Sequence, residues 1–312
     1  MRKLLLVFIM SLMTTISYAR DQISIVGSST VYPFATIVAE RLGKTGIKTP
    51  VIESTGTGGG MKLFCSGIGA NKPDMTNASR AIKSSEKEMC FKNGVTDISQ
   101  VIIGLDGIAF TSSIQGIKVN FTKEQLWQAL ADKGSHPQKW SDIDPSLPNY
   151  KIQVLVPPPT SGTRDAWNEL VMNKGCAKEV QEANKKDCDK LRTDGAAIEA
   201  GENDTLIVQK LSGNTEYFGI FGFSYYENNK DKVQAHTIEG KSISLKSIQD
   251  GSYPISRPLF FYVKNQHKEI IPGIDQYVKE FTSKKAIGKN GYLTQVGLVP
   301  LANPKEAISQ VK

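Results

Sequence analysis

Short apolar runs alternate along this chain with amphipathic stretches, and loops of Gly, Ser and Thr join the two. In "ISIVGSSTVYPFATIVAERLG", Ile23–Val26 has the composition of a strand and Gly27–Thr30 that of a loop. Pro33 suits the first turn of a helix. The apolar residues that follow recur at helical spacing and predict one buried helix face: Phe34, Ile37, Val38 and Leu42.

The same unit is predicted twice more before residue 95. "PVIESTGTGGGMKLFCSG" begins a strand at Val51, continues into a loop with four glycines over 54–60, and then places three apolar residues on one helix face: Met61, Phe64 and Cys65. "PDMTNASRAIKSSEKEMCF" leads from a short strand into the loop 77–80. Ser85 and Glu88 have the spacing of a capping box for the next helix, as Thr122 and Gln125 do further along.

A fourth unit lies in "VLVPPPTSGTRDAW", where three prolines and the turn 161–163 separate an apolar run from a helix that buries Trp167. Alternating strands and helices predict α/β sheets whose ligands bind beyond the carboxyl ends of the strands. Two apolar runs predict strands that cross between two lobes: "VIIGLDGIAFTS" and "ISRPLFFYVK". Another buried strand is predicted in "EYFGIFGFSYY". We expect a first lobe over 20–108 and 258–312, and a second over 109–257.

The four loops have a chemistry in common. The first turn of a helix leaves backbone N–H groups unpaired and carries partial positive charge. Hydroxyls add donors, glycine lets a ligand approach the backbone, and such a site suits an oxyanion. Arg80 and Arg164 add cations at two loops. Plain helix capping is the alternative for any single loop, and a salt bridge is the alternative for Arg164.

The N-terminal segment and the cysteines indicate that the protein is exported. Residues 1–19 combine Arg2 and Lys3, an apolar stretch and a small-x-small site, which predicts a signal peptide cleaved after Ala19; an anchoring helix is the alternative. No Cys lies at that junction, so we expect a soluble periplasmic protein without a lipid anchor. We favour two local disulfides over the other pairings and over metal binding, from the four cysteines Cys65, Cys90, Cys176 and Cys188.

The net charge and the motifs of the chain exclude several classes of function. The net charge of +7 falls to +5 without Arg2 and Lys3, and the lysines are spread out, which argues against nucleic-acid binding. Neither a nucleotide-binding P-loop nor a G-x-S-x-G motif occurs. His136, His236 and His267 are scattered in polar surroundings and are expected at the surface. We therefore expect no catalytic residue, no metal and no cofactor.

Six segments in this order resemble the periplasmic phosphate-binding proteins of high-affinity phosphate ABC transporters: "GSSTVYPF", "STGTGGGMK", "DMTNASRAI", "PPPTSGTRDAW", "GIFGFSYY" and "SRPLFFYV". The resemblance implies an α/β periplasmic binding protein fold with a mixed sheet in each lobe, a two-strand hinge, and a cleft that closes on inorganic phosphate. It implies phosphate-binding roles for Thr30, Val31, Thr57, Ser161, Gly162 and Thr163, and our own hypothesis adds Ser79 and Arg80 to these contacts. Ser29, Gly58 and Arg164 are further candidate contacts.

Two positions depart from the family members that serve as its model. Arg80 stands where they have an Asp that accepts the proton of phosphate, and Pro157 stands where they have an Arg. We expect Arg80 to supply the cation, with Ser79 donating beside it. The implied partners are the permease subunits, and the protein is expected to be a monomer. A receptor for sulfate or a related oxyanion, and a secreted phosphate-ester hydrolase, are the alternatives.

Overall fold

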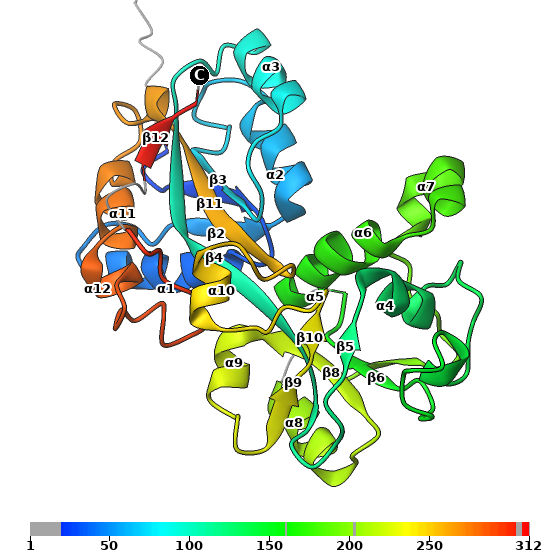
Figure 1. The fold of residues 1–312 in the computed structure, drawn as a ribbon. Helices are drawn as coiled ribbons and strands as arrows, with labels where there is room; N and C mark the ends of the chain where they lie inside the picture. Colours follow the sequence, from blue (N-terminus) through cyan, green and yellow to red (C-terminus); the bar gives the residue numbers. More distant parts are fainter. Residues whose placement is uncertain (1–19, 160, 202–203, 304–307, 312) are drawn as a thin grey trace, which may run out of the picture.

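The computed structural model describes residues 20–159, 161–201, 204–303 and 308–311. The predicted signal peptide therefore lies outside the described residues. All described strands except β5 and β10 form one curled mixed sheet in which β4 belongs to both halves, in the order β2-β1-β3-β11-β4-β8-β6-β7. β12 and β9 also pair with β4. Figure 1 shows an α/β lobe around each half of this sheet.

The first half of the sheet carries the first three predicted units. Three short parallel strands, β1 (Ser24–Gly27), β2 (Val51–Ser54) and β3 (Met75–Ala78), lie side by side with β1 in the middle. Each strand is followed by a helix in the chain: α1 (Tyr32–Gly43), α2 (Gly56–Phe64) and α3 (Ser84–Lys92). The carboxyl ends of the three strands therefore share one edge, where the predicted loops lie.

Two long antiparallel strands connect the halves. β4 (Ile98–Ser113) pairs with β11 (Ser256–Lys264) over 98–107, and from Ile108 to Ser112 it pairs with β8 instead. The partner of β4 thus changes where the chain passes from one half to the other, as can be followed in Figure 1. The lobe boundaries at 108/109 and 257/258 stay a prediction.

The second half is built around the aromatic strand β8 (Phe218–Gly222). Its other strands are β6 (Val154–Val156), β7 (Ala197–Glu199) and β9 (Val233–Ala235), and β5 (Asn120–Phe121) pairs separately with β10 (Thr237–Ile238). Its core is an aromatic cluster in which the rings of Phe110 and Phe218 stack 5.3 Å apart. This buried apolar packing holds the turn after β6 in place.

The remaining helices cover the two halves. The first half adds α11 (Ile274–Phe281) and α12 (Lys284–Ile287), together with β12 (Ile308–Gln310). The second half contains α4 (Lys123–Leu130), α5 (Gly162–Trp167), α6 (Asn173–Gly175), α7 (Lys178–Asn184), α8 (Asp204–Gly213), α9 (Phe223–Glu227) and α10 (Leu245–Gln249). In the described part of the chain, no helix combines the length and apolar character needed to cross a membrane.

Three local predictions were wrong. The capping box at Ser85 and Glu88 does not form, because α3 begins at Ser84 and the Glu86 carboxylate accepts a hydrogen bond from the Lys83 N–H at 2.9 Å. The strand predicted across "GIFGFSYY" ends at Gly222, and α9 follows. His236 and His267 are buried rather than exposed. Polar neighbours in sequence did not reveal their burial, which long-range packing determines.

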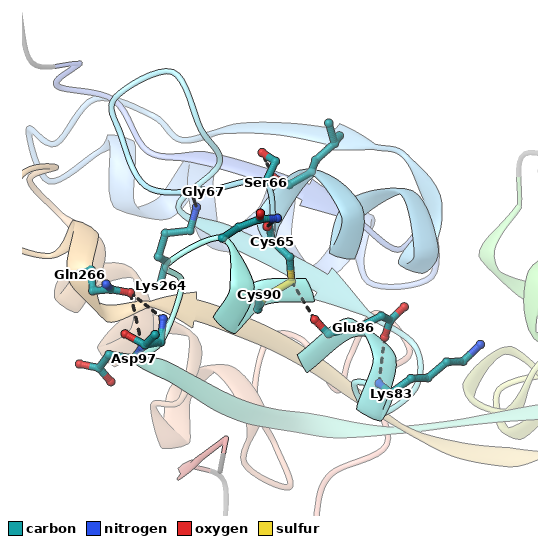
Figure 2. Close-up of a disulfide and its surroundings, with 12 residues drawn as sticks. Cys65, Ser66, Gly67, Lys83, Glu86, Cys90, Asp97, Lys264 and Gln266 are labelled. Carbon is teal, nitrogen blue, oxygen red and sulfur yellow. Dashed lines mark hydrogen bonds between the residues drawn. A yellow bond between two sulfur atoms is a disulfide. The ribbon is translucent and has the colours of Figure 1, made fainter. Parts of the chain in front are cut away.

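Both local disulfides are present. Cys65 pairs with Cys90 and Cys176 with Cys188. The first joins the end of α2 to α3, and Figure 2 shows it beside Glu86 of α3. This cross-link ties the end of α2 to the last turn of α3, and so holds the two helices together at the ends opposite Thr57 and Glu86.

Candidate functional site

The loop after β1 and the end of β3 approach each other closely. Gly27 has a φ of +124°, and a Cβ there would lie 2.2 Å from the Asn77 carbonyl oxygen, so only glycine fits. The Ser28 N–H donates to that carbonyl at 2.9 Å. The Ser28 hydroxyl and the side-chain amide of Asn77 are buried and have no hydrogen-bond partner in the part of the chain that the structure describes. Buried polar atoms of this kind are normally satisfied by a ligand or water.

The start of α1 meets the start of α5. Thr30 precedes α1, and its hydroxyl donates to the Gly162 carbonyl at 3.0 Å. A Cβ on Gly162 would lie 2.4 Å from the Thr30 Cα, so the two backbones are in direct contact. Ser161 caps α5 by accepting from the Thr163 N–H at 3.2 Å. α5 runs without interruption into the π-helix η2 (Asn168–Met172) and α6.

Thr57 and Ser79 form a second hydroxyl pair. Their hydroxyl oxygens are 3.0 Å apart, and the Ser79 N–H donates to the Thr57 hydroxyl at 3.1 Å. Both residues are buried. Thr57 lies in the first turn of α2 and Ser79 follows β3, so the structure brings together two side chains that are 22 positions apart in the sequence.

A cavity of about 990 Å³ lies between the lobes. Its polar lining contains five of the predicted residues: Ser29, Thr30, Ser161, Gly162 and Thr163. Tyr32, Phe34 and Tyr225 add aromatic surface, and Asp106 and Asp165 add carboxylates. Val31 is buried at the start of α1, and Gly58 is exposed on α2. Within the described residues, no cluster of three or more metal-ligating side chains occurs.

The two predicted arginines make different contacts. Arg80 forms two hydrogen bonds with the Glu86 carboxylate, at 2.9 and 2.7 Å, which raise the pKa of its guanidinium. Arg164 is buried and donates to the Pro157 carbonyl at 2.9 Å and to the Asn168 side chain at 3.3 Å. Burial lowers the pKa of Arg164. Glu199 and Asp189 oppose this shift, although neither hydrogen-bonds to the guanidinium among the described residues.

Sequence reasoning did not single out Arg257 of β11. Its side chain is only 5% exposed, and it donates to the Thr30 hydroxyl at 2.9 Å and to the Glu169 carboxylate. It thereby links the start of α1 to the helix that follows α5. The available signal was an arginine placed inside the apolar run "ISRPLFFYV", because an unpaired charge is costly to bury.

Two α/β lobes that share two long strands, with helix starts from both lobes meeting at a hydroxyl-lined cavity, define a two-lobed ligand-binding protein. The model of the PBP superfamily domain matches residues 14–285, and the chain belongs to this family.

Three relatives illustrate the similarity. Protein SphX of Synechococcus elongatus is 31% identical over 283 residues, which cover 88% of this chain and 76% of that protein. The phosphate-binding protein PstS of Staphylococcus saprophyticus is 32% identical over 260 residues, 81% of this chain and 73% of that one. The crystal structure of a possible phosphate-binding protein from Planctomyces limnophilus superposes with a TM-score of 0.73 at 27% identity, covering 90% of this chain and 93% of that chain.

Proposed function

We propose that this protein binds inorganic phosphate between its two lobes and delivers it to the membrane permease of an ABC transporter. The observation that carries the proposal is the contact between Thr30 and Gly162, which places the starts of α1 and α5 at one cavity. Backbone N–H groups and hydroxyls from opposite sides can then surround a small tetrahedral anion. The names of the relatives point to the same ligand.

The charge near the second helix start supports an anionic ligand. Arg164 follows Thr163 directly and is a buried cation that donates hydrogen bonds to two neutral groups, the Pro157 carbonyl and the Asn168 amide, while Glu199 and Asp189 act on its charge from further away. A buried charge without a direct ion pair is unfavourable, and a bound anion nearby would reduce this cost. Charge-assisted hydrogen bonds of about 1.5–3 kcal/mol each would offset the dehydration of the anion.

We propose that phosphate contacts the residues that the sequence analysis predicted. Thr30, Val31, Ser161, Gly162 and Thr163 lie at the two helix starts, and the Thr57–Ser79 pair can turn its hydroxyls from each other to a ligand. The cationic role of Arg80 stays a prediction. Its guanidinium already pairs with Glu86 in this structure, so contact with phosphate would require Arg80 to share or leave that carboxylate.

Receptor function implies further properties that we propose with it. The protein acts in the periplasm as a soluble monomer without a lipid anchor, has no nucleic-acid partner, and catalyses no reaction. The absence of catalysis can be tested with the purified protein and a chromogenic phosphate ester. Hydrolysis of the ester that Ser161→Ala abolishes would contradict this absence and favour a hydrolase.

Calorimetric titration with phosphate tests the binding. We expect one phosphate per chain, and Thr163→Val should weaken binding by about tenfold or more because it removes one hydroxyl donor without changing the side-chain shape. Thr36→Val is the matched control, since the Thr36 hydroxyl only donates to the Tyr32 carbonyl within α1. No heat of binding with phosphate, or equal affinities for all three proteins, would contradict the proposal.

A further inference from the structure

The hydroxyl of Thr30 takes part in two hydrogen bonds of opposite direction. Its oxygen accepts from Nη2 of Arg257 at 2.9 Å, and it donates to the Gly162 carbonyl at 3.0 Å. Because a guanidinium has no acceptor, the Thr30 oxygen must accept from it, and the single hydroxyl hydrogen is then directed elsewhere. Thr30 is therefore set to donate at the start of α1, where it lines the cavity.

Arg257 is held in turn by a carboxylate. Its side chain is 5% exposed, and its Nη1 donates to Oε2 of Glu169. Two other carboxylates lie near this guanidinium without a hydrogen bond to it. Asp106 is 3.8 Å from Nε, and Asp165 is 4.0 Å from Nη2, both beyond hydrogen-bond distance. Of these three carboxylates, Glu169 is therefore the one that fixes where Arg257 points.

Glu169 lies in the π-helix η2, the wide turn between α5 and α6. Two consecutive residues of this turn contact arginines. Asn168 accepts from Arg164 at 3.3 Å, and Glu169 accepts from Arg257. π-helical turns inside α-helices frequently occur at functional sites. Here the turn connects the helix that begins at the cavity with the cation that contacts Thr30.

We propose that Glu169 is a positioning residue for phosphate binding, which holds Arg257 against Thr30 and so presents the Thr30 hydroxyl as a donor. The inference rests on the proposed phosphate-binding function and adds a residue outside the predicted contacts. When phosphate enters the cavity, the Thr30 hydrogen turns from the Gly162 carbonyl to a ligand oxygen. Arg257 meanwhile stays on the Thr30 oxygen.

Removing the charge of Glu169 would release Arg257. The guanidinium would then be attracted to Asp106 and Asp165, and the Thr30 hydroxyl would lose its fixed orientation. Phosphate binding should therefore weaken. A purely electrostatic effect has the opposite sign, because removing a negative charge near a bound anion strengthens its binding.

The test measures calorimetric affinities for phosphate in four proteins: wild type, Glu169→Gln, Thr30→Val and the variant that carries both changes. We expect Glu169→Gln to weaken binding by about fivefold or more when Thr30 is present, and by less than about twofold in the Thr30→Val background. A general structural role of Glu169 would instead give the same factor in both backgrounds, since independent effects add.

Glu227→Gln is the matched control. The Glu227 side chain is 38% exposed, against 39% for Glu169, and it also pairs with a cation, Lys230. We expect its phosphate affinity to stay within about twofold of wild type. A loss as large as that of Glu169→Gln would show that the effect does not depend on the contact with Arg257, and would overturn the inference.

Three further results would overturn it. The first is a Glu169→Gln protein that binds phosphate as tightly as wild type or more tightly, and the second is an equal loss in both backgrounds. The third is a crystal structure of the wild-type protein with phosphate in which Arg257 lies more than about 3.5 Å from Thr30 or from Glu169. This result needs no variant and so remains decisive if Glu169→Gln does not fold. A wild-type protein that binds no phosphate would instead refute the proposed function itself, and the two failures are thus distinguishable.

Discussion

Replacing Gly162 by Ala should prevent the two lobes from closing on a ligand. The added Cβ would lie 2.4 Å from the Thr30 Cα and 2.7 Å from the Thr30 nitrogen. Carbon atoms in contact are normally about 3.5–4.0 Å apart, so the two helix starts must separate by on the order of 1 Å. Both atoms belong to the backbone of the opposite lobe and cannot rotate away as a flexible side chain could.

A separation of that size costs binding energy but leaves each lobe folded. The hydrogen bond from Thr30 to the Gly162 carbonyl, 3.0 Å long, would break. If the ligand loses two charge-assisted hydrogen bonds of about 1.5–3 kcal/mol each, phosphate binding weakens by about 3–6 kcal/mol, or on the order of 10²- to 10⁴-fold. The free energy of unfolding without ligand should change by less than about 0.5 kcal/mol.

Calorimetry with phosphate and urea unfolding without it measure the two quantities separately. Gly213→Ala is the control, because a Cβ at Gly213 has nothing within 4 Å. We expect the control to bind phosphate as the wild-type protein does. Phosphate affinity of Gly162→Ala within about threefold of wild type would refute the reasoning, since the observed contact between the lobes would then have no part in binding.

Three further predictions concern stability. Arg257→Gln should lower the free energy of unfolding by about 1 kcal/mol in urea titrations, because it removes the cation paired with Glu169 while the 39% exposed carboxylate of Glu169 can still be solvated by water; an unchanged midpoint would contradict this. Burial lowers the pKa of His236 from 6.5 to about 3, so the unfolded chain binds the extra proton as the pH falls through this range, and stability is lost. Between about pH 7.5 and pH 5 the loss should be about 2 kcal/mol in wild type and absent in His236→Gln. The double variant Cys65→Ala and Cys90→Ala should lose about 3 kcal/mol of unfolding free energy. The assignment of this bridge would be refuted if reduction of the wild-type protein lowered the unfolding free energy but the double variant did not.

The helix starts could be predicted from sequence because their chemistry is local. Each unit consists of a strand, a loop of Gly, Ser and Thr, and a helix that follow one another within a few residues. The structure contains such strand–loop–helix units at 24–43, 51–64 and 154–167. The capping box of Thr122 and Gln125 formed as predicted for the same reason, with bonds of 2.9 and 3.1 Å. Such a contact joins residues three positions apart, but the spacing alone does not decide where a helix begins, because the same spacing at Ser85 and Glu88 gives no capping box.

The charges of the site could not be predicted in this way. Arg257 and Asp106 face each other only because β11 and β4 pair in one particular register, which brings together distant parts of the chain. The partner of Arg80 was nearer at hand, since Glu86 follows six positions later. The helix start at Ser84, which turns the Glu86 carboxylate back toward Arg80, was however predicted to lie further along the chain.

A crystal structure of the protein with phosphate would test the central claim most directly. The account predicts one phosphate between the lobes, with oxygens within about 3.2 Å of donors at 30–31 before α1 and at 161–163 before and in α5. A phosphate held by one lobe alone, or bound elsewhere on the molecule, would contradict it.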